Sequence, residues 1–274
     1  MTRHVLPGFR LSVGYTLAAL GSCVLLPLAA LVWTACELGP SGWWAQVGTR
    51  RVMASLRLSF GAALLAAVID MVLGLLVAWV LVRYRFALRR LCDALVDLPF
   101  ALPTAVAGIA LTALYAPNGW LGSRLVPFGI EVAYTQLGVL LAMVFVGLPF
   151  VVRTLQPVLE SLEHDLEEAA YILGASPAQR FFRVLLPLLW PTLLTGYALA
   201  LARAIGEYGS VVFISGNRLF RTEITPYLIV QKIDSQYDYR GAAALGAVML
   251  AASLLLLVAI SAWQRRARRW ARLR

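Results

Sequence analysis

Charged residues are scarce in this 274-residue chain. Asp, Glu, Lys and Arg make up 14% of it, whereas hydrophobic residues make up 61%. A soluble domain of this length does not need so much apolar sequence, because much of its surface is polar. The shortage of charge therefore argues against a soluble protein and indicates a chain that lies mostly in lipid.

Residues that carry chemistry are also few. The three cysteines, Cys23, Cys36 and Cys92, show no metal-ligand spacing, and His4 and His164 are far apart. The chain contains no Gly-x-x-x-x-Gly-Lys-Ser/Thr phosphate loop, no His-Glu-x-x-His and no Gly-x-Ser-x-Gly. We therefore expect a non-catalytic chain that binds no metal and no cofactor and does not itself hydrolyse ATP.

Long apolar runs dominate what is present. Backbone groups in lipid must be hydrogen-bonded within the chain, and no two-residue alternation typical of a membrane barrel is visible, so each run of about 20 residues is expected to be a helix. The prediction is an all-α polytopic membrane protein with six spans: Ser12–Thr34, Leu58–Val82, Ala94–Ala116, Thr135–Val152, Pro187–Gly206 and Gly241–Trp263.

The first run resembles a secretion signal, and Leu20-Gly21-Ser22-Cys23 loosely matches a lipoprotein cleavage box. Apolar sequence nevertheless continues to about Val32, which is too long for the apolar core of a signal peptide and long enough to span a bilayer. We interpret this run as an uncleaved first helix.

The distribution of cations predicts the orientation. With the N-terminus inside, fifteen of the 24 Lys and Arg residues fall in cytoplasmic segments, eight fall outside, and Arg203 lies within a span. Both termini are therefore expected in the cytoplasm. The formal charge of +10 could suggest nucleic acid, but the terminal arginines are better explained as a lipid-headgroup anchor.

Three regions are expected along the chain. Residues 1–57 form the first span and an outer loop, residues 58–264 form a core with a cytoplasmic loop at 160–186, and residues 265–274 form a basic tail. No low-complexity linker suggests a second folded domain.

The cytoplasmic loop carries a readable turn. Gly174 can adopt the left-handed conformation that ends a helix. Ser176 then offers an N-cap oxygen, Pro177 suits a first helical position, and Gln179 completes a Ser-x-x-Gln capping box. The loop is therefore predicted to be two short helices joined by a sharp turn.

Small residues precede that turn. Glu168-Ala169-Ala170 leads to Gly174, and Val184-Leu185-Leu186-Pro187 closes the segment. The alanines would let another surface approach closely. This register resembles the EAA loop of bacterial ABC importer permeases, where the turn docks in a groove of a separate ATPase. The alternative is a helical connector that binds no partner. It would not explain why the glutamate, the alanines, the glycine and the closing Leu-Pro all have the spacing of that loop.

The third span opens with two prolines, in the string Asp97-Leu98-Pro99-Phe100-Ala101-Leu102-Pro103-Thr104. Two missing backbone donors kink or loosen a helix, which membranes tolerate where the backbone is buried or lines a cavity. We favour a pathway-lining role for Pro99, Pro103 and Thr104 over a merely kinked packing helix.

The fifth span ends with charges inside the membrane. Arg203 and Glu207 are four residues apart and can meet on one helical face, while Gly206 and Gly209 allow a break there. A structural ion pair is favoured over substrate contact. Asp70, in the second span, has no acidic or His partner deep in other spans and is interpreted as a packing residue.

The proline string, together with Leu148-Pro149-Phe150-Val151-Val152-Arg153, closely resembles the T-type permeases of sulfate/thiosulfate ABC importers, from about Val5 to beyond Ser261. A similar Gly-Glu-Tyr-Gly string closes the fifth span in oxyanion importer permeases, near the gate. The resemblance implies a type I permease in the bacterial cytoplasmic membrane. It also implies a second related permease, two ATPase subunits that bind ATP-Mg, and a periplasmic or surface-tethered binding protein.

Three alternatives remain at this point. Molybdate or tungstate permeases are the nearest relatives that could be confused with this group. A secondary transporter would need a coupling-ion site, and a membrane enzyme would need a polar catalytic cluster. Neither of these two features is found in the sequence.

Overall fold

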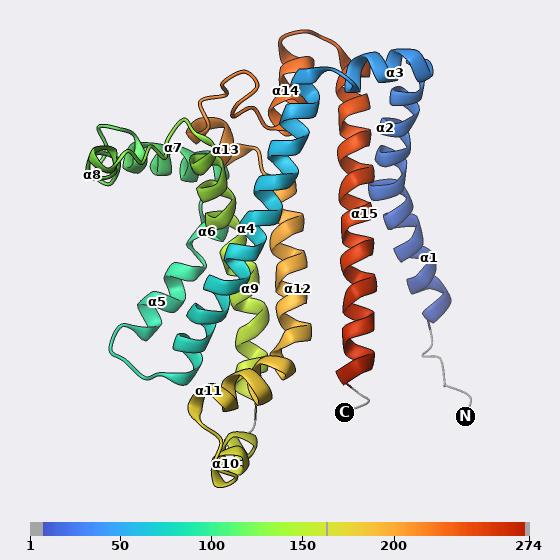
Figure 1. Cartoon of the computed structure of the whole chain (residues 1–274). Helices are drawn as coiled ribbons and strands as arrows, with labels where there is room; N and C mark the ends of the chain where they lie inside the picture. Colours follow the sequence, from blue (N-terminus) through green and yellow to red (C-terminus); the bar gives the residue numbers. More distant parts are fainter. Residues whose placement is uncertain (1–7, 163, 272–274) are drawn as a thin grey trace.

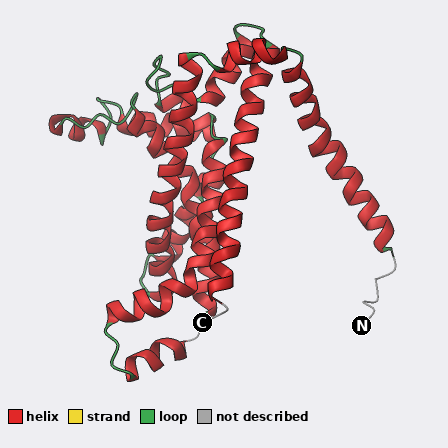
Figure 2. Ribbon diagram, turned by 45° about the vertical axis from the view of Figure 1, so that its right-hand side comes forward, coloured by secondary structure: helices red, strands yellow, loops and turns green. Residues whose placement is uncertain are grey.

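The structure, a computed structural model, describes residues 8–162 and 164–271, and all regular elements in that part of the chain are helical (Figure 2). The predicted all-α fold is confirmed. In chain order the elements are α1 Phe9–Leu20, η1 Gly21–Leu25, α2 Leu26–Cys36, α3 Gly39–Val47, α4 Arg50–Arg83, α5 Arg89–Val96, α6 Leu98–Ala101, α7 Thr104–Tyr115, α8 Gly122–Leu125, η2 Val126–Phe128, α9 Gln136–Ser161, α10 His164–Ile172, α11 Pro177–Gln179, η3 Arg180–Leu185, α12 Leu186–Ile205, α13 Gly209–Ile214, α14 Thr225–Asp234 and α15 Tyr239–Ala271.

The core is formed by α4, α9 and α12, which pack along one another (Figure 1). Small residues let their backbones approach closely: a Cβ added to Gly74 of α4 would lie 2.6 Å from Val151 Cγ1 of α9, and one at Gly196 of α12 would lie 3.1 Å from Val151 Cα. Close packing of small residues is how membrane helices associate, because lipid supplies no hydrophobic drive between them.

Five helical stretches among the described residues are long and apolar enough to cross a membrane: Leu11–Cys36, Arg50–Arg83, Gln136–Ser161, Pro177–Ile205 and Tyr239–Gln264. They confirm five of the six predicted spans, although the second begins at Arg50 rather than Leu58 and the fifth at Pro177 rather than Pro187. The third predicted span, Ala94–Ala116, was expected to be one helix kinked or loosened at its prolines, and the structure instead divides it. That stretch falls within α5, α6 and α7, with breaks beside both prolines.

The broken stretch still traverses the height of the bundle. The core helix α4 ends near α10, and α9 begins at the opposite end of the molecule, so the chain between them has to climb from one end to the other (Figure 1). The third crossing in chain order, which completes the set of six, is therefore made by short helices joined at kinks.

The helix pair α1–α2 stands apart from this core. Helix α2 packs along α15, and α1 diverges from it toward the lower end of Figure 1. None of the most apolar 18-residue window in Leu11–Cys36 is buried within the chain.

The described ends of α1 and α15 lie at the same end of the bundle as α10 and α11, whereas α3 and α14 lie at the opposite end (Figure 1). The predicted basic tail begins as a continuation of α15, and residues 272–274 lie outside the described residues.

Candidate functional site

The turn between α10 and α11 has the predicted geometry. Gly174 has a φ of 80°, in the left-handed region, which confirms its role as a helix terminator. Its amide donates to the carbonyl of Tyr171 at 2.9 Å, and the Ala175 amide donates to that of Ala170 at 3.0 Å. These two bonds form a Schellman motif, which satisfies carbonyls that the end of α10 would otherwise leave unpaired.

The predicted capping box is also confirmed. The Ser176 hydroxyl accepts from the Gln179 amide at 3.3 Å, and the Gln179 side-chain oxygen accepts from the Ser176 amide at 2.9 Å, with Pro177 in the first turn. The helix that starts here is not short, which corrects the sequence prediction. It continues through the π-helical η3 into α12, so the turn is joined rigidly to the fifth span.

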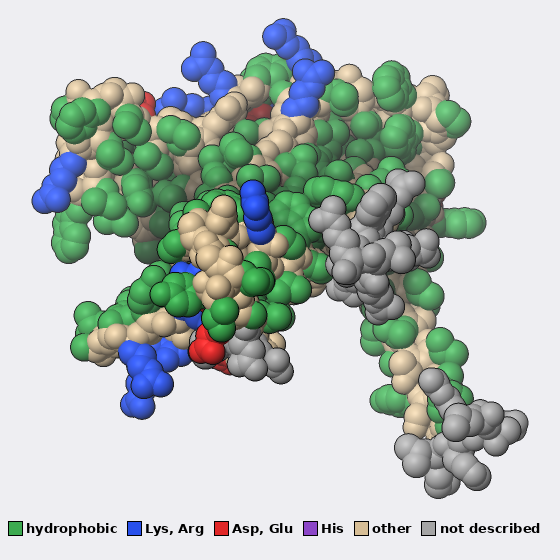
Figure 3. Space-filling model, turned by 60° about the horizontal axis from the view of Figure 1, so that its bottom comes forward, with side chains coloured by type: hydrophobic (Ala, Val, Ile, Leu, Met, Phe, Trp, Pro, Cys, Tyr) green, Lys and Arg blue, Asp and Glu red, His purple; other side chains and the backbone are tan. Residues whose placement is uncertain are grey.

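The tip of this loop is apolar and exposed. Tyr171, Ile172 and Leu173 are 68%, 82% and 87% exposed, and Glu168 and Ala169 of the predicted motif are exposed beside them. In the view toward this end, apolar side chains cover part of the projecting surface, and an acidic side chain lies at its lower edge (Figure 3). So large an apolar tip on the polar side of a membrane protein is typical of a docking surface.

The loop is tied to the core by a charge pair that the sequence did not reveal. Glu167 of α10 forms an ion pair with Arg83 at the end of α4, and the Arg83 guanidinium lies 5.3 Å from the Trp79 ring centroid. Movement of the loop would therefore be transmitted to α4 through this ion pair, as well as to α12 through the continuous helix.

Two helix breaks, between α6 and α7 and between α12 and α13, precede half-helices that pack together. Leu102, before Pro103, is extended with a ψ of 134°, as the residue preceding a proline prefers, and α7 starts at Thr104. The fifth span ends at Ile205 with Gly206 as its C-cap, and α13 starts at Gly209. Both breaks were expected from the prolines and glycines.

The half-helices that follow these breaks, α7 and α13, pack against each other. A Cβ on Gly209 would collide with Thr104 Oγ1, and a Cβ on Gly108 would collide with the Ser210 carbonyl oxygen. The structure thus brings together Thr104 and Gly209, two predicted pathway residues. Pro99 lies elsewhere, in α6, where the neighbouring Phe100 packs edge-on against Phe150 of α9.

Arg203 and Glu207 form the predicted ion pair. Glu207 is 1% exposed, and its second oxygen accepts from both the amide and the hydroxyl of Ser210 at 2.8 Å. Glu207 therefore also binds the first turn of α13, a capping role that the sequence analysis missed. The signal was present in the three-residue spacing from Glu207 to Ser210 across a helix-breaking glycine.

Asp70 is buried at the centre of the core, against Gly147 of α9, where an added Cβ would collide with its carboxyl oxygen. Neither of its oxygens has a hydrogen-bond partner among the described residues. The interpretation of Asp70 as a packing residue is consistent with this position.

A polar cluster holds the broken third crossing in place. Arg153 of α9 donates to Asp93 Oδ1 and Asp97 Oδ1 at 2.7 Å each, and Gln156 Nε2 donates to Asp93 Oδ1 at 2.9 Å. Sequence reasoning did not find this cluster, because Asp93 and Asp97 are at least 56 residues from Arg153 and Gln156.

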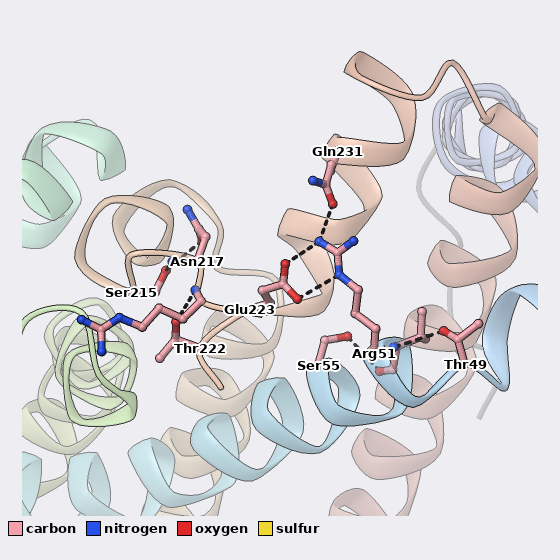
Figure 4. Close-up of polar contacts among 10 residues, drawn as sticks. Thr49, Arg51, Ser55, Ser215, Asn217, Thr222, Glu223 and Gln231 are labelled. Atoms are coloured by element: carbon pink, nitrogen blue, oxygen red, sulfur yellow. Dashed lines mark hydrogen bonds and ion pairs between the residues drawn. The ribbon is translucent and has the colours of Figure 1, made fainter. Parts of the chain in front are cut away.

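At the opposite end, a second cluster fixes the loop between α13 and α14 (Figure 4). Arg51 of α4 donates from Nε to Glu223 Oε2 at 2.9 Å and from a terminal nitrogen to Gln231 Oε1 at 2.7 Å. Thr49 caps α4 by accepting from the Val52 amide at 3.3 Å. Because Glu223 is buried, this bidentate pair pins the loop firmly to α4.

The sequence matches a family model and several named permeases. Residues 70–272 match the family model described as binding-protein-dependent transport system inner membrane component. The chain is 48% identical to the sulfate transport system permease protein CysT of Salmonella typhimurium, over 97% of this chain and 95% of that protein. It is 52% identical to a probable sulfate transport system permease protein of Nephroselmis olivacea, over 87% and 84%.

Among solved structures, a chain of a bacterial alginate ABC transporter, crystallised with its alginate-bound periplasmic protein, superposes with a TM-score of 0.76. The match covers 94% of this chain and 93% of that one at 15% identity, so it speaks for the fold alone. The chain belongs to the binding-protein-dependent transport system inner membrane component family, as a CysT-like ABC permease.

Proposed function

We propose that this inner-membrane permease imports sulfate, with thiosulfate as a related substrate, as half of the channel of an ATP-driven importer. The supporting observation is identity of about half over nearly the whole chain to permeases named for sulfate transport. Those names favour sulfate over the molybdate or tungstate alternative.

The exposed turn is the proposed contact with the ATPase. Glu168, Ala169 and Ala170 approach the turn at Gly174, and Ser176 and Pro177 leave it into a helix continuous with the fifth span. An ATPase groove that accepts the apolar tip would thereby move α12 directly. ATP-Mg would bind to that partner and be hydrolysed there. This chain would change conformation and would catalyse no reaction itself.

The family fold supports our proposal for the remaining assembly. A second, related permease would complete the channel, two ATPase subunits would bind at the α10 end, and a periplasmic binding protein would deliver the anion at the α14 end. Both termini would then be cytoplasmic, which fits the position of the described ends beside α10 (Figure 1).

The junction of α7 and α13 is the proposed gate region. Pro103 and Gly206 break the two helices, Thr104 and Gly209 seat one half-helix on the other, and broken membrane helices are tolerated where backbone is buried or lines a cavity. Glu207 would hold the break through Arg203 and Ser210, which favours a structural role over contact with the anion.

Reconstitution tests this proposal. Vesicles that contain the chain, its second permease and the ATPase should take up labelled sulfate only with the loaded binding protein outside and ATP inside. Vesicles with this chain alone should take up none. Accumulation of sulfate by this chain alone, without ATP, would refute the proposal, and uptake of molybdate in preference to sulfate would correct the substrate.

A further inference from the structure

A groove lies at the α14 end of the molecule, beside the first turns of α9. One cavity of about 590 Å³ is bounded by the outer part of α4, the first turns of α9 and the loop at residues 220–223. A second, of about 440 Å³, adjoins it and shares Gln136, Leu137 and Arg221 in its wall. The two cavities form one open groove, called here the outer groove.

The outer groove is rich in cations. Arg57 and Arg221 line the first cavity and Arg218 the second, and Arg50 stacks on Phe220, which also lines the first, at 5.7 Å from its ring centroid. In the part of the chain that the structure describes, none of these four guanidinium groups is paired with a carboxylate.

Acidic groups do not balance this charge. Glu223 lines the first cavity, but both of its oxygens are engaged by Arg51. Glu131 lines the second cavity and is the remaining carboxylate in the walls. The outer groove therefore carries a net positive charge.

The loop that carries two of these arginines is held by hydrogen bonds. The Arg218 amide donates to the Thr222 hydroxyl at 2.8 Å, and Gln136 Nε2 donates to the Arg221 carbonyl at 3.0 Å. Figure 4 shows two further contacts of this loop, between Ser215 and Asn217 within it and between Glu223 and Arg51 of α4. Fixed backbone holds Arg218 and Arg221 beside the groove before any ligand arrives, which lowers the entropy cost of binding.

The start of α9 adds to the positive field. Thr135 is its N-cap but makes no side-chain hydrogen bond to the first turn, and Gln136 and Leu137 of that turn line both cavities. Uncapped first-turn amides and the positive end of a long helix favour a bound anion.

We propose that the outer groove binds a tetrahedral oxyanion group between Arg57, Arg221 and the first turn of α9. Guanidinium groups bind such oxyanions through charge-assisted, bidentate hydrogen bonds. Two sources share this chemistry: the sulfate ion awaiting entry, and the phosphate of an anionic phospholipid whose chains contact Leu58, Leu65 and Leu140. The sulfate source rests on the proposed function.

Arginine reactivity tests the proposal on the intact transporter complex in nanodiscs, without substitutions. The rate of phenylglyoxal modification is followed by mass spectrometry at Arg57 and Arg221, with Arg124, an exposed arginine of α8, as internal control. In zwitterionic lipid, millimolar sulfate should slow the groove arginines about tenfold relative to chloride of equal ionic strength and leave Arg124 unchanged.

A second arm replaces the zwitterionic lipid by phosphatidylglycerol. Protection there without sulfate would identify the lipid as the source, whereas protection by sulfate alone would identify the ion. Rates at Arg57 and Arg221 that neither sulfate nor phosphatidylglycerol lowers would overturn the proposal. The assay needs no transport, so failure of sulfate import by the wild-type complex would count against the proposed function and leave this result standing.

A variant pair separates an anion site from a docking surface for the binding protein. Arg57→Gln should abolish the protection of Arg221, and Arg57→Lys should retain part of it because the charge remains. If Arg57→Gln instead leaves the protection of Arg221 intact and only raises the binding-protein concentration needed for half-maximal uptake, the groove is a protein interface and the proposal is wrong.

Discussion

At the scale of single residues, the structure separates charges that hold the fold from charges that have no partner. Glu207 is enclosed and fully engaged by Arg203 and Ser210, whereas Arg203 keeps 30% of its side chain exposed. The consequences of removing the two members of this pair are therefore unequal.

Arg203→Met should be the more harmful substitution. It leaves the Glu207 carboxylate buried without its cation, at a cost on the order of 3–5 kcal/mol, while Glu207→Gln leaves a partly exposed guanidinium. The double variant Arg203→Met with Glu207→Gln should yield more folded protein than Arg203→Met alone, measured as monodisperse material in detergent. A double variant no better folded than that single one would show that the pair is not the reason for the loss.

Gly108→Ala should loosen the α7–α13 junction. The added methyl group would collide with the Ser210 carbonyl, which is backbone and cannot rotate away, so overpacking should cost about 1–3 kcal/mol. Gly14→Ala in α1 is the matched control, because its Cβ would meet nothing within 4 Å. Thermal unfolding in detergent should show a lower midpoint for Gly108→Ala only, and equal midpoints would contradict this packing.

At the scale of helices, local chemistry was predictable and long-range pairing was not. The turn at Gly174 and the Ser176 capping box depend on residues within a few positions of one another, and both were predicted. The breaks at Pro103 and Gly206 were also indicated, because proline and glycine act on their own backbone.

Other features depend on the packed bundle. The division of the third crossing into three helices is fixed in part by Arg153, which reaches back to Asp93 and Asp97 from another helix. The pairing of Arg51 with Glu223 likewise joins segments 172 residues apart. No periodicity or motif within one segment encodes such contacts. The sequence therefore predicted a kinked span, whereas the structure divides it into three separate helices.

Gly174→Val should detach the ATPase. A β-branched residue is disfavoured in the left-handed region by about 1–2 kcal/mol, so the Schellman motif and the apolar tip would be reshaped. Gly174→Asn is the matched control, because asparagine tolerates this conformation and the position has open space around it. Affinity purification should recover much less ATPase with the Val variant than with the Asn variant. Equal recovery would mean that the turn is not the contact.

At the scale of the whole molecule, the arrangement of crossings is set by where the long helices begin and end. Helices α4 and α9 both run toward the α10 end, so the kinked stretch between them must return the chain to the other face (Figure 1). Six crossings then place the described ends of α1 and α15 on the face that carries the α10–α11 turn, the proposed ATPase contact. An excess of arginine on that face fits retention in the cytoplasm.

Reporter fusions test this topology, and above all the kinked crossing. Green fluorescent protein fused after Arg274 should fluoresce, because it folds in the cytoplasm, and alkaline phosphatase inserted after Asn118 should be active, because α5, α6 and α7 have carried the chain outside. A phosphatase inserted after Arg85 should be inactive, since that loop is cytoplasmic. If the reporters at 85 and 118 instead behave alike, the stretch from Arg89 to Tyr115 does not cross, and the α10 turn and the C-terminus would lie on different sides from those proposed.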